Sequence, residues 1–294
     1  MKYTPWVPSL GRLIAFICFC GGLAWNVTAQ TWMNTNLTAS QRATLLLNSM
    51  TVAQEINMIA GAGAGTNGNY VGNIPGISQL DIPGLNLQDG PAGVADGVGN
   101  VTAFPAPIGL GATWDIAMAR QYGNYLGAEA RGKGVEVLLG PMMNMARAYE
   151  SGRTFEGYGE DPFLTGAMAA AEIPGIQSQG VIATAKHFVC YEQETDRTLV
   201  SSDVDERTQQ EIYYMPFLQS VRAGAGAVMA SYNRLNSRHA CETEALNTTL
   251  KKLWGFNGFV MSDWGATFST VAGMDNGTDM DMYCGLLPDQ HHLR

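Results

Sequence analysis

The sequence has few of the residues that build metal and nucleotide sites. Its four histidines stand at positions 187, 239, 291 and 292, and none has the H-x-x-x-H spacing of a metal-binding helix. It has no C-x-x-C pair and no G-x-S-x-G segment of the kind that presents a nucleophilic serine. The glycine-rich segment at 61–72 has no expected strand before it, so we interpret it as a loop rather than a dinucleotide fingerprint. We therefore expect no bound metal and no cofactor.

Charged residues are also scarce. They make up 15% of the chain, and 17 Lys and Arg against 26 Asp and Glu give a formal net charge of −9. This negative charge disfavours nucleic acid and anionic membrane surfaces as partners. The apolar fraction of 46% is large enough for a sizeable core, which excludes a disordered chain. A chain of 294 residues then predicts one large domain or two small ones.

The first 29 residues have the features of a secretory signal. Lys2 and Arg12 provide a basic start, residues 13–25 form an apolar run, and residues 27–29 are a small-residue cleavage site. The apolar run is short for a membrane span, so a retained anchor is the weaker alternative. We expect a secreted, extracellular protein whose mature form is a single domain, residues 30–294, with no membrane attachment.

Secretion changes how the remaining cysteines and asparagines are interpreted. Cys190, Cys241 and Cys284 remain after cleavage, and an oxidising compartment favours one disulfide and one free thiol. We expect the pair Cys190–Cys241, because both residues follow candidate strands. The N-x-S/T pattern predicts four glycosylation sites, at Asn36, Asn100, Asn247 and Asn276.

Short apolar segments alternate with longer amphipathic ones along most of the chain. The pattern predicts a first helix over 38–58, capped by Ser40, and later helices over 116–132, 164–179 and 206–223. Seven strands are expected, over 85–88, 108–112, 135–139, 181–186, 227–231, 259–262 and 278–282. This alternation is typical of an α/β fold with a parallel sheet.

Polar residues fall at or just beyond the ends of these strands. They are Asp89, Asn144, Lys186, His187, Tyr232 and Asp263. In a (β/α)8 barrel such positions converge on one pocket, whereas a doubly wound sheet is the competing arrangement. Seven strands are one fewer than a barrel needs. We therefore expect a (β/α)8 TIM-barrel-like domain that is incomplete at its C-terminal end.

Each of these polar residues also has a simple structural explanation. Asp89 could accept hydrogen bonds within its own turn, Arg153 could belong to a surface ion-pair cluster, and Asp263 could cap a following helix. Taken together, however, the carboxylates, cations and aromatic residues suit a polyhydroxylated neutral ligand. Sugar hydroxyls take charged hydrogen-bonding groups, and a sugar ring face packs on Trp or Tyr. A retaining glycosidase also needs a carboxylate nucleophile, for which Asp263 is the best candidate.

Seven motifs, in order, resemble the N-terminal domain of glycoside hydrolase family 3, and most closely that of secreted fungal β-glucosidases. They lie between residues 35 and 285: LQDGP (87–91), AFPAPIGLGATWD (103–115), GRTFEGYGEDP (152–162), AKHF (185–188), EQE (192–194), MASYNRLN (229–236) and GFVMSDWGA (258–266). The resemblance implies a retaining β-glucosidase that forms a covalent glycosyl-enzyme on Asp263 and releases terminal glucose from cello-oligosaccharides or aryl glucosides. It implies substrate-binding roles for Asp89, Arg153, Lys186, His187, Met229, Tyr232 and Trp264. It also implies that Lys186 and Arg153 help to keep Asp263 ionised.

The sequence departs from the family pattern in three places. Ala95 and Asp96 stand where an Arg often follows LQDGPAGV, and Tyr191 replaces the Asn usual before EQE. The family's acid/base Glu lies in a second domain, to which no residue of this chain can be matched, so we expect a chain truncated before that domain. Two alternatives stay open: a non-catalytic sugar-binding fragment and a β-xylosidase-type exo-glycosidase. A truncated barrel also predicts assembly through exposed barrel surface.

Overall fold

The computed structural model describes residues 30–61 and 70–282, and the chain divides into two units, 1–46 and 47–294. In the first unit, η1 (Thr31–Met33) precedes the start of α1 (Ala39–Leu47). Arg42 Nε donates a hydrogen bond of 2.6 Å to the Trp32 carbonyl oxygen, which ties α1 to η1.

The helix predicted over 38–58 is in fact two helices, α1 and α2 (Val52–Ile59). Each begins with a reciprocal capping box, since Thr38 exchanges hydrogen bonds with Gln41 and Thr51 does so with Gln54. The expectation that Ser40 caps the helix is wrong, because it lies inside the first turn of α1. Thr51 caps the start of α2, and the continuous apolar pattern of the sequence did not reveal this second helix start.

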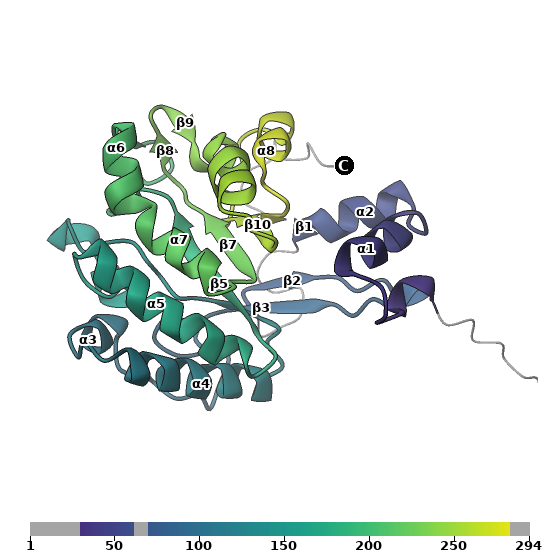
Figure 1. Ribbon diagram of the computed structural model, residues 1–294, viewed down its shortest axis with the longest axis horizontal. Coiled ribbons are helices and arrows are strands. Elements are labelled where there is room, and N and C mark those ends of the chain that lie inside the picture. The colour runs from purple at the N-terminus through teal and green to yellow at the C-terminus, as the bar shows by residue number, and fades with distance from the viewer. Residues whose placement is uncertain (1–29, 62–69, 283–294) are drawn as a thin grey trace, which may run out of the picture. The chain divides into compact units, whose positions relative to one another are not determined.

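The second unit is built on a curled sheet of six strands (Figure 1). Its order is β10 (Phe259–Ser262), β7 (Ala227–Ala230), β5 (Ile182–Phe188), β4 (Val137–Leu139), β3 (Leu85–Asp89) and β2 (Gly72–Ile74). All neighbours are parallel except β2, which runs antiparallel to β3. The parallel strands therefore present their carboxyl ends along one edge, as an α/β barrel requires.

Two short strands continue the curl beyond β10. β1 (Ala60–Gly61) pairs in parallel with β11 (Asp281–Met282), and a parallel bridge between Met261 and Met280 connects this pair to β10. At the other edge of the sheet, Gly72 of β2 packs closely against the side chains of Met282 and Trp264. A Cβ at this position would lie 2.8 Å from Met282 Cε and 2.9 Å from Trp264 Cζ2. The domain is thus an incomplete TIM-barrel-like fold, as the sequence predicted.

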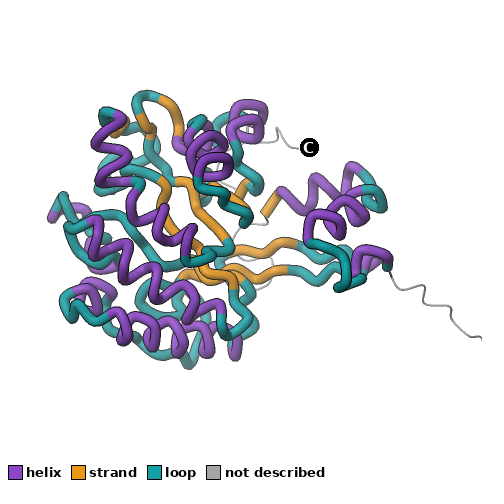
Figure 2. Tube along the Cα trace, viewed as in Figure 1, coloured by secondary structure: helices purple, strands orange, loops and turns teal. Residues whose placement is uncertain are grey.

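Helices follow most of the parallel strands and pack outside the sheet (Figures 1 and 2). α4 (Ile116–Gly132) has the predicted bounds, and α5 (Pro162–Gln177) begins and ends two residues before its predicted bounds. Glycines allow these two helices to touch, since a Cβ at Gly123 would lie 2.3 Å from the Glu172 carbonyl oxygen. The other segments are α3 (Pro107–Gly111), η7 (Leu246–Leu253) and α8 (Thr270–Asn276), and a small sheet of β6 (Ser201–Ser202), β8 (Arg234–Leu235) and β9 (Arg238–His239).

Two further element predictions were wrong. The segment 108–112, expected as a strand, is α3, because Pro107 stands in the first turn, where a missing N–H costs nothing. The helix expected over 206–223 is interrupted, with α6 (Glu206–Thr208), a π-helical segment η5 (Gln209–Tyr213) and α7 (Met215–Arg222). Of the loop expected at 61–72, residues 62–69 lie outside the described residues, and its ends belong to β1 and β2.

The predicted disulfide between Cys190 and Cys241 is also wrong, because both thiols are free and buried. Cys190 follows β5 and Cys241 lies in η6 (Ala240–Glu242), and both pack in the hydrophobic core. Burial raises the pKa of each thiol, so both behave as small apolar side chains. Cys284, His291, His292 and the expected signal at 1–29 lie outside the described residues.

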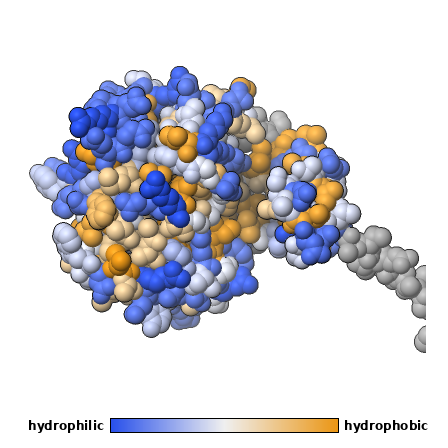
Figure 3. Space-filling model, in the orientation of Figure 1, coloured by the Kyte–Doolittle hydropathy of each residue, from blue (hydrophilic) through white to orange (hydrophobic). Residues whose placement is uncertain are grey.

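The surface over the outer helices mixes hydrophilic side chains with apolar ones (Figure 3). Exposed large apolar residues include Trp114, Tyr125 and Phe163. Assembly through exposed apolar surface stays a prediction. Among the described residues, no helix is long and apolar enough to span a membrane.

Candidate active site

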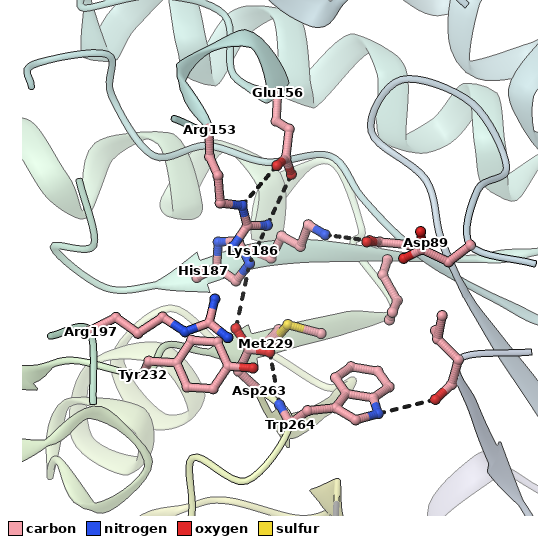
Figure 4. Close-up of a pocket in the computed structure, with 13 residues that line it drawn as sticks. Asp89, Arg153, Glu156, Lys186, His187, Arg197, Met229, Tyr232, Asp263 and Trp264 are labelled. Atoms are coloured by element: carbon pink, nitrogen blue, oxygen red, sulfur yellow. Dashed lines mark hydrogen bonds and ion pairs between the residues drawn. The ribbon is translucent and has the colours of Figure 1, made fainter. Parts of the chain in front are cut away.

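A cavity of about 400 Å³ opens where the parallel strands end (Figure 4). Asp89 is the last residue of β3, Lys186 and His187 belong to β5, and Asp263 directly follows β10. The lining residues are Val71, Asp89, Asp96, Leu139, Arg153, Glu156, Lys186, His187, Arg197, Met229, Tyr232, Asp263 and Trp264. All eight site residues expected from the sequence are therefore in one cavity, and Asn144 lies directly behind it.

One end of the cavity holds an ion pair between Lys186 and Asp89. The Lys186 Nζ atom lies 2.7 Å from Asp89 Oδ1, and the lysine side chain is almost fully buried. Burial alone would raise the pKa of Asp89, but the charge and hydrogen bond of Lys186, with Arg153 behind them, hold it below its usual value. Asp89 is thus an ionised hydrogen-bond acceptor rather than merely a turn residue.

Arg153 is held in a fixed orientation by two carboxylates. Its Nε and Nη2 atoms donate to the two oxygens of Glu156 at 2.7 and 3.0 Å, and Nη1 lies 3.5 Å from Glu194 Oε1. Although burial opposes its charge, the hydrogen bonds and charge of Glu156 raise the pKa of Arg153. The ion-pair cluster around Arg153, for which a surface position was the simple explanation, therefore forms part of the cavity wall. The Nη2 atom of Arg153 also lies close to the His187 ring.

His187 is buried and neutral. Its ring Nδ1 lies 2.8 Å from Asn144 Oδ1, and its Nε2 lies 3.3 Å from Arg153 Nη2. Burial, followed by the charges of Arg153 and Lys186, lowers the pKa of His187 well below its usual value. The 3.7 Å separation between Nε2 and Asp263 Oδ2 is consequently not an ion pair at neutral pH.

Asp263 is a buried carboxylate in which one oxygen accepts a hydrogen bond and the other has no hydrogen-bond partner among the described residues. Oδ1 accepts a 2.8 Å hydrogen bond from the Trp264 backbone N–H, whereas Oδ2 has no hydrogen-bond partner among the described residues. Burial raises the pKa of Asp263; the Trp264 N–H, Lys186, Arg153 and the Tyr232 hydroxyl only partly offset this. The expected influence of the two cations is present but weaker than desolvation. Asp263 does not cap a helix, since α8 begins at Thr270 after Ser269.

Aromatic and apolar side chains form the wall around Asp263. Trp264 is fixed by a 3.1 Å hydrogen bond from its Nε1 to the Val71 carbonyl oxygen, and Met229 is buried below it in β7. Tyr232 lies on the other side of Asp263 (Figure 4). Burial and the neighbouring Asp263 raise the pKa of Tyr232, so its phenol stays protonated and can donate a hydrogen bond.

Besides Glu156, which lies in the motif GRTFEGYGEDP, the sequence reasoning missed two charged lining residues. Arg197 places its guanidinium 4.0 Å from the Tyr232 ring centroid and pairs with Glu194 at 3.0 Å. Asp96 was noticed only as a departure from the family pattern, and burial, then the charge of Asp89, raises its pKa. Both residues come from irregular loops, so a search for polar residues at strand ends could not find them.

The described residues contain no group of three or more His, Cys, Asp or Glu that could hold a metal ion. The cavity instead offers fixed donors from Arg153 and Lys186, fixed acceptors from Asp89 and Asp263, and an apolar wall. Such a set can bind and orient a ring that carries several hydroxyl groups. Asp263 Oδ2 is the only fully buried carboxylate oxygen in the described lining that has no hydrogen-bond partner.

Comparison with known proteins gives consistent matches. Residues 73–283 match the glycosyl hydrolase family 3 N terminal domain. A β-glucosidase of Rhizobium radiobacter is 45% identical over 244 residues, 81% of this chain and 29% of the relative. The structure of a β-glucosidase from Streptomyces venezuelae with D-glucose has a TM-score of 0.80 and 40% identity, covering 84% of this chain and 31% of that one. The structure of a β-glucosidase from Chaetomella raphigera has a TM-score of 0.79 and 40% sequence identity, covering 83% of this chain and 34% of that one. The chain therefore spans about a third of the length of these proteins.

Proposed function

Because this chain belongs to glycosyl hydrolase family 3, we propose that its cavity binds the terminal glucose of a β-glucoside and that Asp263 is the nucleophile of a retaining β-glucosidase. The observation that carries this proposal is the buried carboxylate of Asp263, a residue that lines the cavity and whose Oδ2 has no hydrogen-bond partner among the described residues. The similar proteins named above are β-glucosidases, one of them solved with D-glucose.

The proposed reaction uses Asp263 in its ionised form. Asp263 Oδ2 attacks the anomeric carbon of the bound sugar, the bond from that carbon to the aglycone oxygen breaks, and the departing oxygen takes a proton from water. Water then cleaves the glycosyl ester, which releases the sugar and restores the carboxylate. A leaving group that is stable as an anion needs no proton. A substrate with such a leaving group therefore tests the attack by Asp263 separately from protonation of the departing oxygen.

The rest of the cavity supplies binding and orientation. Asp89 accepts and Lys186 donates hydrogen bonds at one end, while Arg153 and His187 bind hydroxyl groups closer to Asp263. Trp264 and Met229 pack against the apolar face of the ring. Charge-assisted hydrogen bonds of this kind fix the sugar relative to the nucleophile, which lowers the entropic barrier to attack.

A covalent trapping experiment tests this function on the purified chain. A 2,4-dinitrophenyl 2-deoxy-2-fluoro-β-glucoside is expected to add one fluoroglucosyl group to the peptide that contains Asp263, detected by mass spectrometry. Asp263→Asn should not be labelled, because its amide is a poor nucleophile, and Asp81→Asn, an exposed control, should be labelled like the parent chain. Glucose binding without labelling would instead support the sugar-binding alternative. Preferential labelling by the corresponding 2,4-dinitrophenyl 2-deoxy-2-fluoro-β-xyloside would support a β-xylosidase.

We also propose that the mature protein is extracellular and glycosylated at Asn36 and Asn100. Both side chains are exposed. The other two sequons are less suitable, because the Asn247 and Asn276 amides donate hydrogen bonds to the Asp275 and Glu242 carbonyl oxygens at 3.3 and 2.8 Å. Peptide mass mapping of secreted protein, before and after glycan removal, tests this: glycans on Asn276 and bare Asn36 would contradict it.

A further inference from the structure

Asn144 contacts His187 through three hydrogen bonds from behind the cavity. It lies in the loop after β4 and is 3% exposed. Its Oδ1 atom accepts from the His187 backbone N–H at 2.9 Å and lies 2.8 Å from the ring Nδ1, and its Nδ2 donates to the His187 carbonyl oxygen at 3.1 Å. One amide side chain thus contacts both the backbone and the ring of the same residue.

These three contacts determine which ring nitrogen carries the proton. A backbone N–H can only donate and a backbone carbonyl can only accept, so the Asn144 amide has one permitted orientation. Its oxygen therefore faces Nδ1, and Nδ1 must carry the hydrogen. In a neutral imidazole the other nitrogen is then bare, so Nε2 is a hydrogen-bond acceptor.

The groups that surround Nε2 on the cavity side are consistent with a nitrogen that carries no hydrogen. Arg153 Nη2, which can only donate, lies 3.3 Å from it. Ionised Asp263 can only accept, and its Oδ2 lies 3.7 Å from Nε2 without a hydrogen bond between them. A group bound at this point meets acceptors in His187 and Asp263 and a donor in Arg153.

We propose that Asn144 is a positioning residue that keeps His187 Nε2 an acceptor, so that the cavity selects a sugar hydroxyl which donates a hydrogen bond at this point. The inference rests on the proposed sugar binding. It identifies a requirement for a hydroxyl proton, since fluorine in the same place could accept from Arg153 but could not donate to His187. Charged and titratable groups around the ring are Arg153, Lys186, Arg197, Asp263, Tyr191 and, through its hydrogen bond to Asn144, Glu192.

The first test needs no sugar. Nitrogen NMR of the whole chain with ¹⁵N-labelled histidine, with the His187 signals assigned by their absence in His187→Gln, should show a protonated Nδ1 and a bare Nε2 near neutral pH. A protonated Nε2 in the unliganded chain would overturn the proposal. This result is independent of labelling at Asp263, so failure here and failure of the proposed glucosidase are distinguishable.

The second test changes the amide to a carboxylate. Asn144→Asp should favour the charged imidazolium, because an anion at Nδ1 stabilises it, and Nε2 then becomes a donor. The pKa of His187 should rise, and glucose affinity near neutral pH should fall about tenfold, as one hydrogen bond is lost. Asn124→Asp is the control, since Asn124 Oδ1 accepts a 3.1 Å hydrogen bond from the Ser178 hydroxyl outside the cavity, which a carboxylate can still accept.

Ligand analogues separate positioning from a general loss of structure. For the parent chain, one of the four monofluoro derivatives of glucose (2-, 3-, 4- or 6-) should bind as weakly as the corresponding deoxy sugar. In Asn144→Asp that fluoro sugar should recover relative to glucose, because Nε2 now donates. The His239 ring serves as an internal reference in the spectra and should not move. Unchanged His187 signals and unchanged ligand preference in a folded Asn144→Asp chain would refute the proposed role.

Discussion

The ammonium group of Lys186 lies 2.7 Å from the carboxylate of Asp89, although the two residues are 97 positions apart in the chain. They come from β5 and β3, which are separated in the sheet by β4. The contact places a positive charge at the cavity end of β5 and keeps Asp89 ionised despite its burial. Asp89 therefore depends on Lys186 to remain charged where a sugar would bind.

Replacing Lys186 by Met should weaken glucose binding about 10- to 100-fold, because a charged hydrogen-bond donor is lost. The pKa of Asp89 should rise once its main partner is gone. Unfolding should become easier by about 1–3 kcal/mol, less than for a fully buried pair because Asp89 is partly solvated. Calorimetry with glucose and urea unfolding measure the two effects.

The matched control is Lys251→Met. Lys251 pairs with Asp279 at 2.6 Å, also between distant parts of the chain, but neither residue lines the cavity. This variant should lose stability without losing glucose affinity. An equal loss of affinity in both variants would mean that the Lys186 effect is only structural.

Asp263→Asn should stabilise the fold at neutral pH while it removes the nucleophile. Burial raises the pKa of Asp263 above its unfolded value, so the folded chain holds this proton more tightly than the unfolded chain. Its contribution to stability is therefore complete below pH 3.8 and is lost as pH rises through the folded-state pKa. Asparagine has no such loss, and a gain on the order of 1 kcal/mol at pH 7 is typical of removing a functional polar group. Thermal melts from pH 3 to 8 measure it; equal stability at every pH would contradict the argument.

The strand framework was predictable because the five parallel strands are short segments with polar residues at their ends or a few positions beyond them. β3, β4, β5, β7 and β10 were all located in this way, and their parallel pairing then brings Asp89, Lys186, His187 and Asp263 to one edge. Most of the eight expected site residues line one cavity because they lie at or just beyond strand ends, whereas Arg153 precedes η4 (Thr154–Glu156) in a loop well beyond β4. Their roles remain proposals that the trapping experiment addresses.

Features that depend on tertiary contacts were not predictable. β1 and β2 have two and three residues, too few to show a period, and exist only because β11 and β3 pair with them. The apolar run at 108–112 fits a strand or a helix equally well by its pattern alone. Nothing in the spacing of Cys190 and Cys241 revealed that each is buried separately in the core.

Glu172 should make the stability of the fold depend on pH far from the cavity. Burial raises the pKa of Glu172 to about 8, only partly offset by the hydrogen bond that Tyr158 donates at 2.7 Å. The folded chain therefore holds a proton that the unfolded chain releases near pH 4.5, so stability is lost as pH rises from about 4.5 through 8. In Glu172→Gln this loss, about 3–5 kcal/mol in all, should disappear. Urea unfolding at pH 5 and 9 tests it, with exposed Glu211→Gln as the control that keeps the parent slope.

Arg197 should contribute to sugar binding by holding Tyr232 in place. Its guanidinium lies 4.0 Å from the Tyr232 ring centroid and bonds to Glu194, which also approaches Arg153 at 3.5 Å. Arg197→Ala removes the cation over the ring and one partner of Glu194, so glucose affinity should fall about three- to tenfold. Arg197→Lys should recover little of this, since an ammonium group cannot lie flat on the ring and bond to Glu194 at once.

A suitable control for Arg197 is Arg207→Lys, because Arg207 pairs with Glu211 at 2.9 Å on the surface and does not line the cavity. Isothermal titration should show the same glucose affinity for this control as for the parent chain. Affinity should then decrease in the order parent, Arg197→Lys, Arg197→Ala. If Arg197→Lys bound glucose as tightly as the parent, the charge alone would matter and the stacking geometry would not. If Arg197→Ala also bound normally, Tyr232 would be held by its packing against Tyr191, whose ring centroid lies 6.1 Å away.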